Sequence, residues 1–252
     1  MLQGRTALVV GGASGIGAAI AVAFGAAGAS VVIGDRTPGG GLAAGDSAAP
    51  AGGVGPAGIV GSVTLDVTDE RSVAGAVAAV TELVGPLDIL VNSAGILTES
   101  PLAEMSLDTW SETLAVDLTG VFLCCRAVLP GMLARGSGRI ISIASQLGIK
   151  GGTGLAHYAA AKAGVIALTK SLALEVSARG VLVNAIAPGP IDTPLVEGIT
   201  EEWKRAKRAE LPLGRFGRPE EVAPTAVLLA SDPGGNLYVG QTLGPNSGDV
   251  MP

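Results

Sequence analysis

The stretch Thr6-Ala-Leu-Val-Val-Gly11-Gly-Ala-Ser-Gly15-Ile-Gly17 passes from a short apolar run, through closely spaced glycines, into a helical pattern. Glycine permits a tight turn and close backbone approach, and a helix beginning there offers free amides and a positive dipole end. The spacing differs from the Gly-x-Gly-x-x-Gly fingerprint but follows the same physical logic. It predicts a strand-turn-helix unit that holds the diphosphate of a dinucleotide. The residues expected there are Gly11, Ser14, Gly15, Ile16 and Gly17.

The same alternation continues along the chain, which is typical of a parallel sheet built from β-α-β units. The expected strands are Thr6–Val10, Ser30–Gly34, Ile59–Leu65, Leu87–Asn92, Gly138–Ala144, Val181–Ala187 and Gln241–Leu243. The expected helices are Gly15–Ala27, Glu70–Leu83, Leu107–Ala134, Ala156–Arg179, Glu201–Ala209 and Pro219–Ser231. Most strand segments are near-continuous apolar runs, as in a sheet covered by helices on both faces. We therefore expect one doubly wound α/β domain without an internal linker.

One segment, Thr37–Gly58, departs from this pattern because it is rich in glycine and proline. Gly and Pro cost about 1 and 3 kcal/mol each in a helix interior. We expect a long loop there, with at most a short helix around Gly41–Ala44, and interpret it as a surface insertion rather than a functional lid.

The composition excludes several classes of function. The net charge of −6 argues against nucleic-acid binding, which needs a basic footprint. The single histidine and the adjacent Cys124 and Cys125 provide no plausible metal site. The chain begins directly with a predicted strand, and its apolar stretches are short and interrupted. We therefore expect no signal peptide, no membrane span and a cytoplasmic location.

A second motif, Tyr158-Ala-Ala-Ala-Lys162, carries the chemistry. Tyrosine and lysine four residues apart share one face of a helix, so the ammonium can lower the pKa of the phenol from about 10 toward working pH. Ser145 lies upstream, after the apolar run 140–144. Together with the glycine turn, these residues in this order resemble the short-chain dehydrogenase/reductase family, and the resemblance runs from about Arg5 to Gly248.

The resemblance implies a single Rossmann-like domain over 1–252, with a dinucleotide-binding half at about 1–136 and a catalytic half at about 137–252. It implies that Tyr158 is the general acid/base, that Lys162 lowers the tyrosine pKa and binds the nicotinamide ribose, and that Ser145 binds the substrate oxygen. The family's Asn-Leu-x-Gly stretch reads Asp117-Leu118-Thr119-Gly120 here. The family asparagine holds a water that relays protons to the lysine. We expect Asp117 to be ionised at a site open to solvent through that water chain.

The cofactor implied is a nicotinamide dinucleotide. Asp35 ends the second strand, where a carboxylate accepts hydrogen bonds from the ribose hydroxyls and repels a 2′-phosphate. Arg36 is a weaker signal in the opposite direction, and we predict NAD(H). By resemblance, further cofactor contacts follow the later strands. They are Asp66, Val67, Asn92, Ala94, Gly95, Pro188, Gly189, Ile191 and Thr193.

The substrate is less constrained. Gln146, Leu147, His157 and 195–208 are expected to shape its pocket, with His157 lining a groove or facing another subunit. The basic cluster within 204–208 is better explained as a solvated helix face than as an anion site. The leading hypothesis is NAD(H)-dependent interconversion of a secondary alcohol and a ketone. One alternative is a 3-oxoacyl-thioester reductase, which an NADPH preference and a basic patch would favour. The other is a catalytically silent dinucleotide-binding scaffold.

We also expect a homotetramer, as in the family. The helices around 107–134 and 156–179 carry more apolar and small residues than one sheet-facing stripe requires. Ala159, Ala163, Val165, Ala167 and Leu174 cannot all face the same sheet. A second subunit would cover the apolar and small residues that do not face the sheet.

Overall fold

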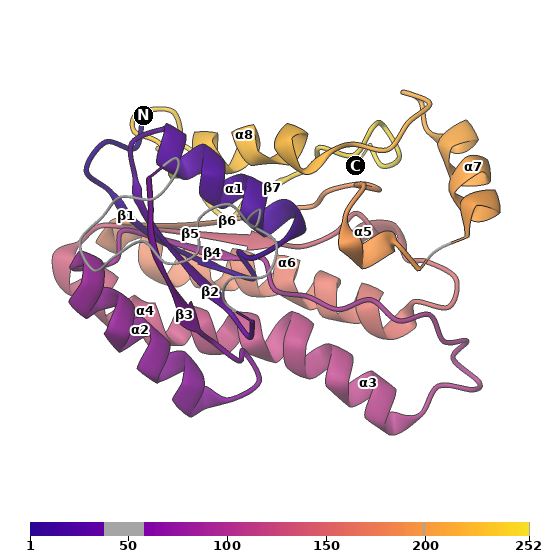
Figure 1. Ribbon diagram of the computed structural model, residues 1–252, viewed down its shortest axis with the longest axis horizontal. Coiled ribbons are helices and arrows are strands. Elements are labelled where there is room, and N and C mark those ends of the chain that lie inside the picture. Colours follow the sequence, from indigo (N-terminus) through magenta and orange to yellow (C-terminus); the bar gives the residue numbers. More distant parts are fainter. Residues whose placement is uncertain (38–57, 199, 252) are drawn as a thin grey trace.

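The computed structural model describes residues 1–37, 58–198 and 200–251. Its centre is a seven-stranded parallel sheet in the order β3-β2-β1-β4-β5-β6-β7 (Figure 1). The strands are β1 Thr6–Val10, β2 Ser30–Asp35, β3 Ile59–Thr64, β4 Ile89–Asn92, β5 Gly138–Ile143, β6 Val181–Ile186 and β7 Thr242–Leu243. The chain order reverses direction between β1 and β4. In open α/β sheets, ligands bind at the carboxyl ends of the strands beside such a reversal.

Helices cover both faces of the sheet, as the apolar strands require. On one face lie α1 Gly15–Ala26 and α8 Pro219–Ala230, which pack against each other (Figure 1). On the other lie α2 Glu70–Val84, α4 Gly120–Arg135 and α6 Ala156–Val176. Each face has its own core: Phe24 and Ile20 belong to the first, and Met132 and Ile140 to the second. The central strands are therefore buried on both sides.

A continuous helix from 107 to 135 contains an irregular turn. The α-helix α3 Leu107–Leu114 passes through a π-helical turn, η2 Ala115–Thr119, into α4. By length and apolar composition 107–135 could cross a membrane, but half of its most apolar window is buried against the rest of the protein. The apolar character is thus explained as that of a core helix. Inserted π turns are frequent at functional sites, and this one carries Asp117.

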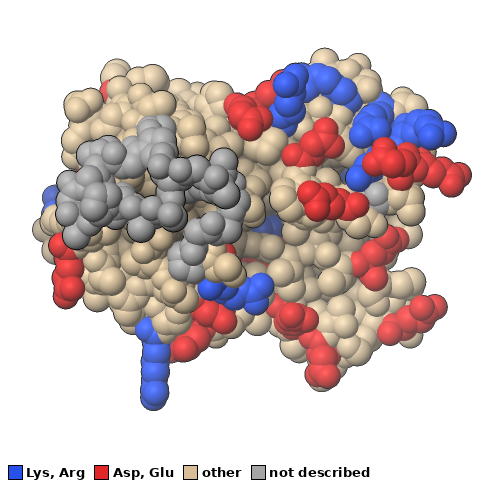
Figure 2. Space-filling view, in the orientation of Figure 1, with Lys and Arg blue, Asp and Glu red and all other residues tan. Residues whose placement is uncertain are grey.

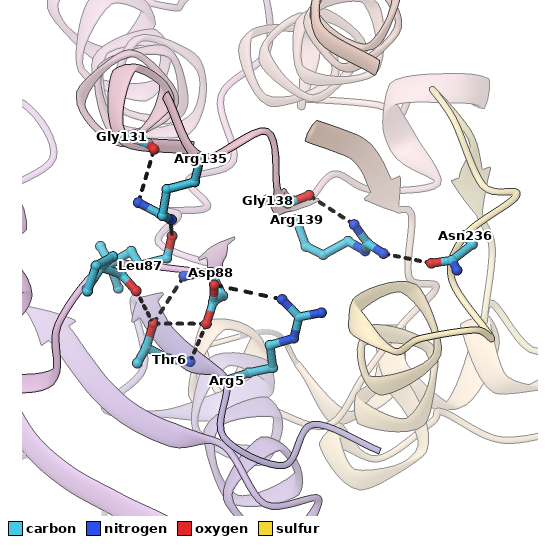
Figure 3. A network of polar contacts seen from close by, with 10 residues as sticks. Arg5, Thr6, Leu87, Asp88, Gly131, Arg135, Gly138, Arg139 and Asn236 are labelled. Carbon is cyan, nitrogen blue, oxygen red and sulfur yellow. Dashed lines mark hydrogen bonds and ion pairs between the residues drawn. The ribbon is translucent and has the colours of Figure 1, made fainter. Parts of the chain in front are cut away.

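Polar side chains fasten the amino-terminal edge of the sheet, away from the ligand-binding edge (Figure 3). The Thr6 amide donates to Asp88 Oδ2 (3.0 Å), and Arg5 pairs with the same carboxylate (3.8 Å). Arg139 at the start of β5 donates to Asn236 (2.7 Å). The first two contacts join the start of β1 to the residue before β4, and the third joins the start of β5 to the loop after α8. They stabilise the edge of the sheet opposite the carboxyl ends of the strands.

The predicted elements agree with the structure to within about two residues at each end. The exception is Ala156–Arg179, whose last three residues form a separate 3-10 turn, Ser177–Arg179. The short helices α5 Leu147–Lys150 and η4 Pro194–Val196 were not predicted. Both are a single turn long, too short to show helical periodicity. The loop expected over Thr37–Gly58, with at most a short helix around Gly41–Ala44, lies outside the described residues except at its two ends.

Candidate active site

A cavity of about 1090 Å³ opens at the carboxyl edge of the sheet. The residues after β1, β2, β4, β5 and β6 line it, together with α7 Glu201–Glu210. Ser145, Tyr158 and Lys162 lie along the same wall as the glycine turn, which begins at Gly11. The structure therefore brings the two sequence motifs, about 150 residues apart, into one site.

The glycine turn is shaped by close backbone contacts. A Cβ on Gly11, which has a φ of +73°, would lie 2.4 Å from the Ala94 amide nitrogen. A Cβ on Gly17 would lie 2.1 Å from the Gly11 carbonyl oxygen. Neither position accepts a side chain, so helix α1 begins directly against the loop, with Ser14 and Gly15 at the cavity wall. These residues fit a dinucleotide diphosphate at the helix N-terminus.

Asp35 lies at the cavity wall with its carboxylate held in place. Oδ2 accepts from the Ala13 amide (3.2 Å) and Oδ1 from the Thr37 amide (3.2 Å). Arg36 lines the cavity beside it but makes no ion pair with Asp35 among the described residues. The carboxylate is thus linked to the glycine turn at the position where the sequence predicts the adenosine ribose.

Most other predicted cofactor residues also line the cavity. They are Ile16, Asp66, Val67, Ala94, Gly95, Pro188, Gly189, Ile191 and Thr193. Asp66 Oδ1 accepts two hydrogen bonds from Thr68, which are the main reason that its pKa lies below the usual value. Asn92 lies elsewhere: its amide donates to Ser142 (3.1 Å) and Cys125 (3.4 Å) in the core. Its role is therefore to join β4 to β5 and α4.

The Tyr158 and Lys162 side chains share one face of α6, as predicted. Lys162 Nζ lies 5.5 Å from the centre of the Tyr158 ring and donates to the Ile143 carbonyl (3.1 Å). Its second partner is Asp117 Oδ2 at 3.1 Å. An ammonium group has three donors, so one remains for the cavity. Ser145 Oγ accepts from the Leu147 amide (3.1 Å), and a hydrogen bond between the Ser145 and Tyr158 side chains lowers the tyrosine pKa.

The surroundings of Tyr158 change the predicted effect on its pKa. Burial is the largest influence and raises the pKa, Lys162 opposes it, and Asp117 raises it further. Lys162 lowers the pKa, as predicted, but burial outweighs it and the net direction is upward. For Lys162, burial by itself would lower the pKa, but Asp117 and Tyr158 together raise it. The ammonium is therefore firmly protonated.

Asp117 differs from the expectation in its access to solvent. The side chain is fully buried, and Oδ1 accepts from the Ile96 amide (2.9 Å) while Oδ2 contacts Lys162 directly. The expected access to solvent is wrong, because the side chain is fully buried and the π turn places the carboxylate against the ammonium. Asp117 is held instead by its ion pair with Lys162 and by the hydrogen bond from the Ile96 amide.

His157 is also placed differently from the prediction. It is fully buried, and Nε2 lies 2.9 Å from Thr98 Oγ1. It therefore neither lines the cavity nor faces another subunit, since the helix turns it into the segment after β4. Gln146 and Leu147 do line the cavity, as do Leu195, Trp203 and Lys207.

Sequence reasoning missed two residues at the substrate end, Lys150 on α5 and Asp249 near the carboxyl terminus. Their side chains form an ion pair of 2.7 Å, and Asp249 also pairs with Lys207 (2.9 Å). No local motif marks these positions. A carboxylate in the otherwise apolar and glycine-rich final segment was the single available signal.

Three comparisons with known proteins agree with this geometry. A family model described as enoyl-(acyl carrier protein) reductase matches residues 11–248. The chain is 42% identical over 250 residues to the 3-oxoacyl-(acyl-carrier-protein) reductase FabG of Vibrio cholerae, covering 99% of each chain. It is 43% identical over 245 residues to the cis-4-hydroxycyclohexanecarboxylate dehydrogenase of Sinomonas cyclohexanicum, covering 97% of this chain and 96% of the relative. The crystal structure of gox2181 superposes with a TM-score of 0.87 at 34% identity, covering 98% of this chain and 96% of that one.

Proposed function

Since the chain belongs to the short-chain dehydrogenase/reductase family, we propose that it is an NAD(H)-dependent oxidoreductase that interconverts 3-oxoacyl and 3-hydroxyacyl thioesters. The observation that carries the chemistry is the convergence of Ser145, Tyr158 and Lys162 on the cavity that also contains the glycine turn. A nicotinamide dinucleotide, when bound, supplies or accepts the hydride.

The protein's own groups handle the substrate oxygen. In the direction of reduction, the Tyr158 hydroxyl donates a proton to the carbonyl oxygen as the carbon is reduced. Ser145 donates a hydrogen bond to the same oxygen and stabilises the charge that develops there. The Lys162 ammonium stabilises the phenolate left on Tyr158. Its bonds to Ile143 and Asp117 hold it in position.

The choice of thioester rests on the relatives. Proteins named 3-oxoacyl-(acyl-carrier-protein) reductase from Vibrio cholerae, Pseudomonas aeruginosa and Escherichia coli match 99% of this chain at 42%, 41% and 39% identity. They support the thioester better than the generic alcohol and ketone that the sequence favoured. The choice of NAD(H) rests on Asp35, whose carboxylate is fixed at the ribose end of the cavity.

The second candidate is a dehydrogenase for a simple cyclic alcohol, favoured by the similarity to the Sinomonas relative. Reduction of acetoacetyl-CoA and of cyclohexanone, each with NADH and with NADPH, separates the two. We expect the highest kcat/KM for acetoacetyl-CoA with NADH. A higher kcat/KM for cyclohexanone would favour the second candidate, and a higher kcat/KM with NADPH would contradict the role of Asp35.

A further inference from the structure

The substrate end of the cavity contains a charge cluster that the reaction does not use: Gln146, Lys150, Lys207 and Asp249. Gln146, Lys150 and Lys207 line the cavity. Their polar ends all meet the Asp249 carboxylate: Lys150 lies 2.7 Å from Oδ2, Lys207 lies 2.9 Å from Oδ1, and the Gln146 amide donates to Oδ2. Both oxygens of Asp249 are therefore occupied.

The position of Asp249 is set by a braced turn. The Asn246 side chain accepts from the Gly248 amide (3.0 Å) and donates to the Val250 carbonyl (2.7 Å). A Cβ on Gly248 would lie 2.7 Å from Pro212, just beyond α7, and a Cβ on Gly189 would lie 2.7 Å from Asn246. The turn is thus held between the end of β6 and the end of α7. It presents Asp249 to two helices, α5 and α7.

The same contacts hold α7 at the cavity wall. None of the residues of α7 is fully buried, so little apolar packing attaches this helix to the body of the protein. Its outer face carries basic and acidic side chains next to each other (Figure 2). Lys204 pairs with Glu201 (3.2 Å) and Lys207 with Glu210 (3.0 Å). Arg208 also lies 3.8 Å from Glu201, so three of the four basic residues of α7 have acidic partners.

The burial of Asp249 reduces the screening of its charge by solvent. Its side chain is 8% exposed, compared with 14% for Lys207 and 31% for Lys150. The other acidic groups at this end, Glu99 and Glu210, are exposed, and solvent screens their charges. A carboxylate among partly buried ammonium groups interacts more strongly than one in water. Without it, Lys150 would lose its carboxylate partner and Lys207 would keep only the exposed Glu210, which leaves one excess positive charge at the cavity.

We propose that Asp249 is a specificity-determining residue. It pairs with both Lys150 and Lys207, and together with Glu210 on Lys207 it brings the two lysines to zero net charge, so that the substrate end favours molecules uncharged near the reacting carbonyl. The inference rests on the proposed function and deepens it, because the acyl part of a 3-oxoacyl thioester is uncharged. A substrate carboxylate at the same place would have to displace Asp249, which the turn holds permanently beside both lysines. Specificity of this kind arises from rejecting the wrong ligand as much as from binding the right one.

The test compares two ligands that differ mainly in charge, 4-oxopentanoate and its methyl ester. Their Kd values are measured by calorimetry with the full chain saturated with oxidised cofactor, so no turnover is needed. We expect wild type to favour the ester. Asp249→Asn should shift the ratio of the two Kd values toward the acid by about tenfold, the effect of one close charge. Adding Lys150→Met to Asp249→Asn should remove most of that shift.

A matched control removes one negative charge elsewhere. Glu70→Gln breaks the exposed Arg126–Glu70 pair between α2 and α4, whose residues do not line the cavity, and should leave the ratio unchanged. If Asp249→Asn weakens both ligands equally, Asp249 acts only by docking α7, and the inference is overturned. An unchanged ratio, or the absence of binding by either ligand to every variant, also overturns it. Reduction of acetoacetyl-CoA tests the proposed function separately. If the enzyme does not reduce it, the proposed function fails, but a change in the ratio of the two Kd values would still support the role of Asp249.

Discussion

The Asp117 carboxylate lies 3.1 Å from the Lys162 ammonium, and both side chains are buried. This ion pair joins the π turn between α3 and α4 to the catalytic face of α6. It gives the lysine a fixed partner on the side away from the substrate, and it partly offsets the attraction between the ammonium and the Tyr158 phenolate. The proton affinity of Tyr158 is therefore set by burial first and then by Lys162, Asp117 and Ser145 together.

We predict that Asp117→Asn shifts the rising limb of the pH–rate profile of alcohol oxidation to lower pH. Asp117 raises the Tyr158 pKa, so removal of its charge should lower that pKa and allow Tyr158 to accept a proton at lower pH. Asparagine retains an acceptor for the Ile96 amide, so the local fold should survive. The measurement is a pair of pH–rate profiles with one substrate, with Asp108→Asn on the exposed start of α3 as control. Superimposable profiles would refute the charge argument.

Tyr158→Phe should remove the transferable proton while preserving the ring packing. Turnover should fall by roughly 10²- to 10⁴-fold, the usual contribution of a positioned acid/base. NADH binding, followed by fluorescence, should remain within a few-fold of wild type. Tyr238→Phe is the matched control, since Tyr238 packs against the core on the face of the sheet that α1 and α8 cover. Wild-type turnover in the Tyr158 variant would place the proton transfer elsewhere.

Asp35→Ala should weaken the preference for NADH over NADPH. Asp35 lies where we expect the adenosine ribose, and removal of its carboxylate relieves the repulsion of a 2′-phosphate. The ratio of kcat/KM with NADH to kcat/KM with NADPH should therefore fall by about tenfold or more. Asp66→Ala is the control, because it removes a carboxylate from the same cavity at the predicted adenine contact and should affect both cofactors alike. An unchanged ratio in the Asp35 variant would mean that another group selects the cofactor.

Gly75→Ala should stabilise the protein by about 0.5–1 kcal/mol. Gly75 lies exposed in the middle of α2, and a Cβ there would meet no atom within 4 Å. Alanine therefore reduces the conformational entropy of the unfolded chain without straining the folded one. Ala74→Gly, at the neighbouring exposed position, should destabilise by a similar amount. Urea unfolding of the three proteins measures both effects, and equal midpoints would contradict the prediction.

We propose that the chain assembles as a tetramer through α4 and α6. Val165 faces the core, but Ala163, Ala167 and Leu174 on α6 are exposed, and Leu174 is 85% exposed. Phe122 on α4 is also partly exposed, beneath the Arg126 guanidinium. Light scattering at micromolar concentration should give the mass of four chains, and Leu174→Glu should reduce it. A stable wild-type monomer would reject the proposal.

The elements and the catalytic motif could be predicted because their signals are local. The apolar runs of β1, β4 and β5 mark buried parallel strands wherever they occur in a chain. Tyr158 and Lys162 are four residues apart on a helix, so their shared face follows from helix geometry alone. The close approach at Gly11 and Gly17 likewise follows from a tight strand-to-helix turn. These features depend on spacing along the chain.

The electrostatics of the site were decided only by the tertiary structure. The upward shift of the Tyr158 pKa depends on burial and on Asp117, which lies 41 positions earlier in the chain. The cluster at the substrate end joins Gln146 to Asp249, 103 positions apart, through a turn that sequence periodicity does not reveal. The energy of a charge depends on its distance from other charges and on its exclusion from water. Both quantities are set when distant segments pack together, so the sequence could indicate candidate catalytic residues but not the balance of charge around them.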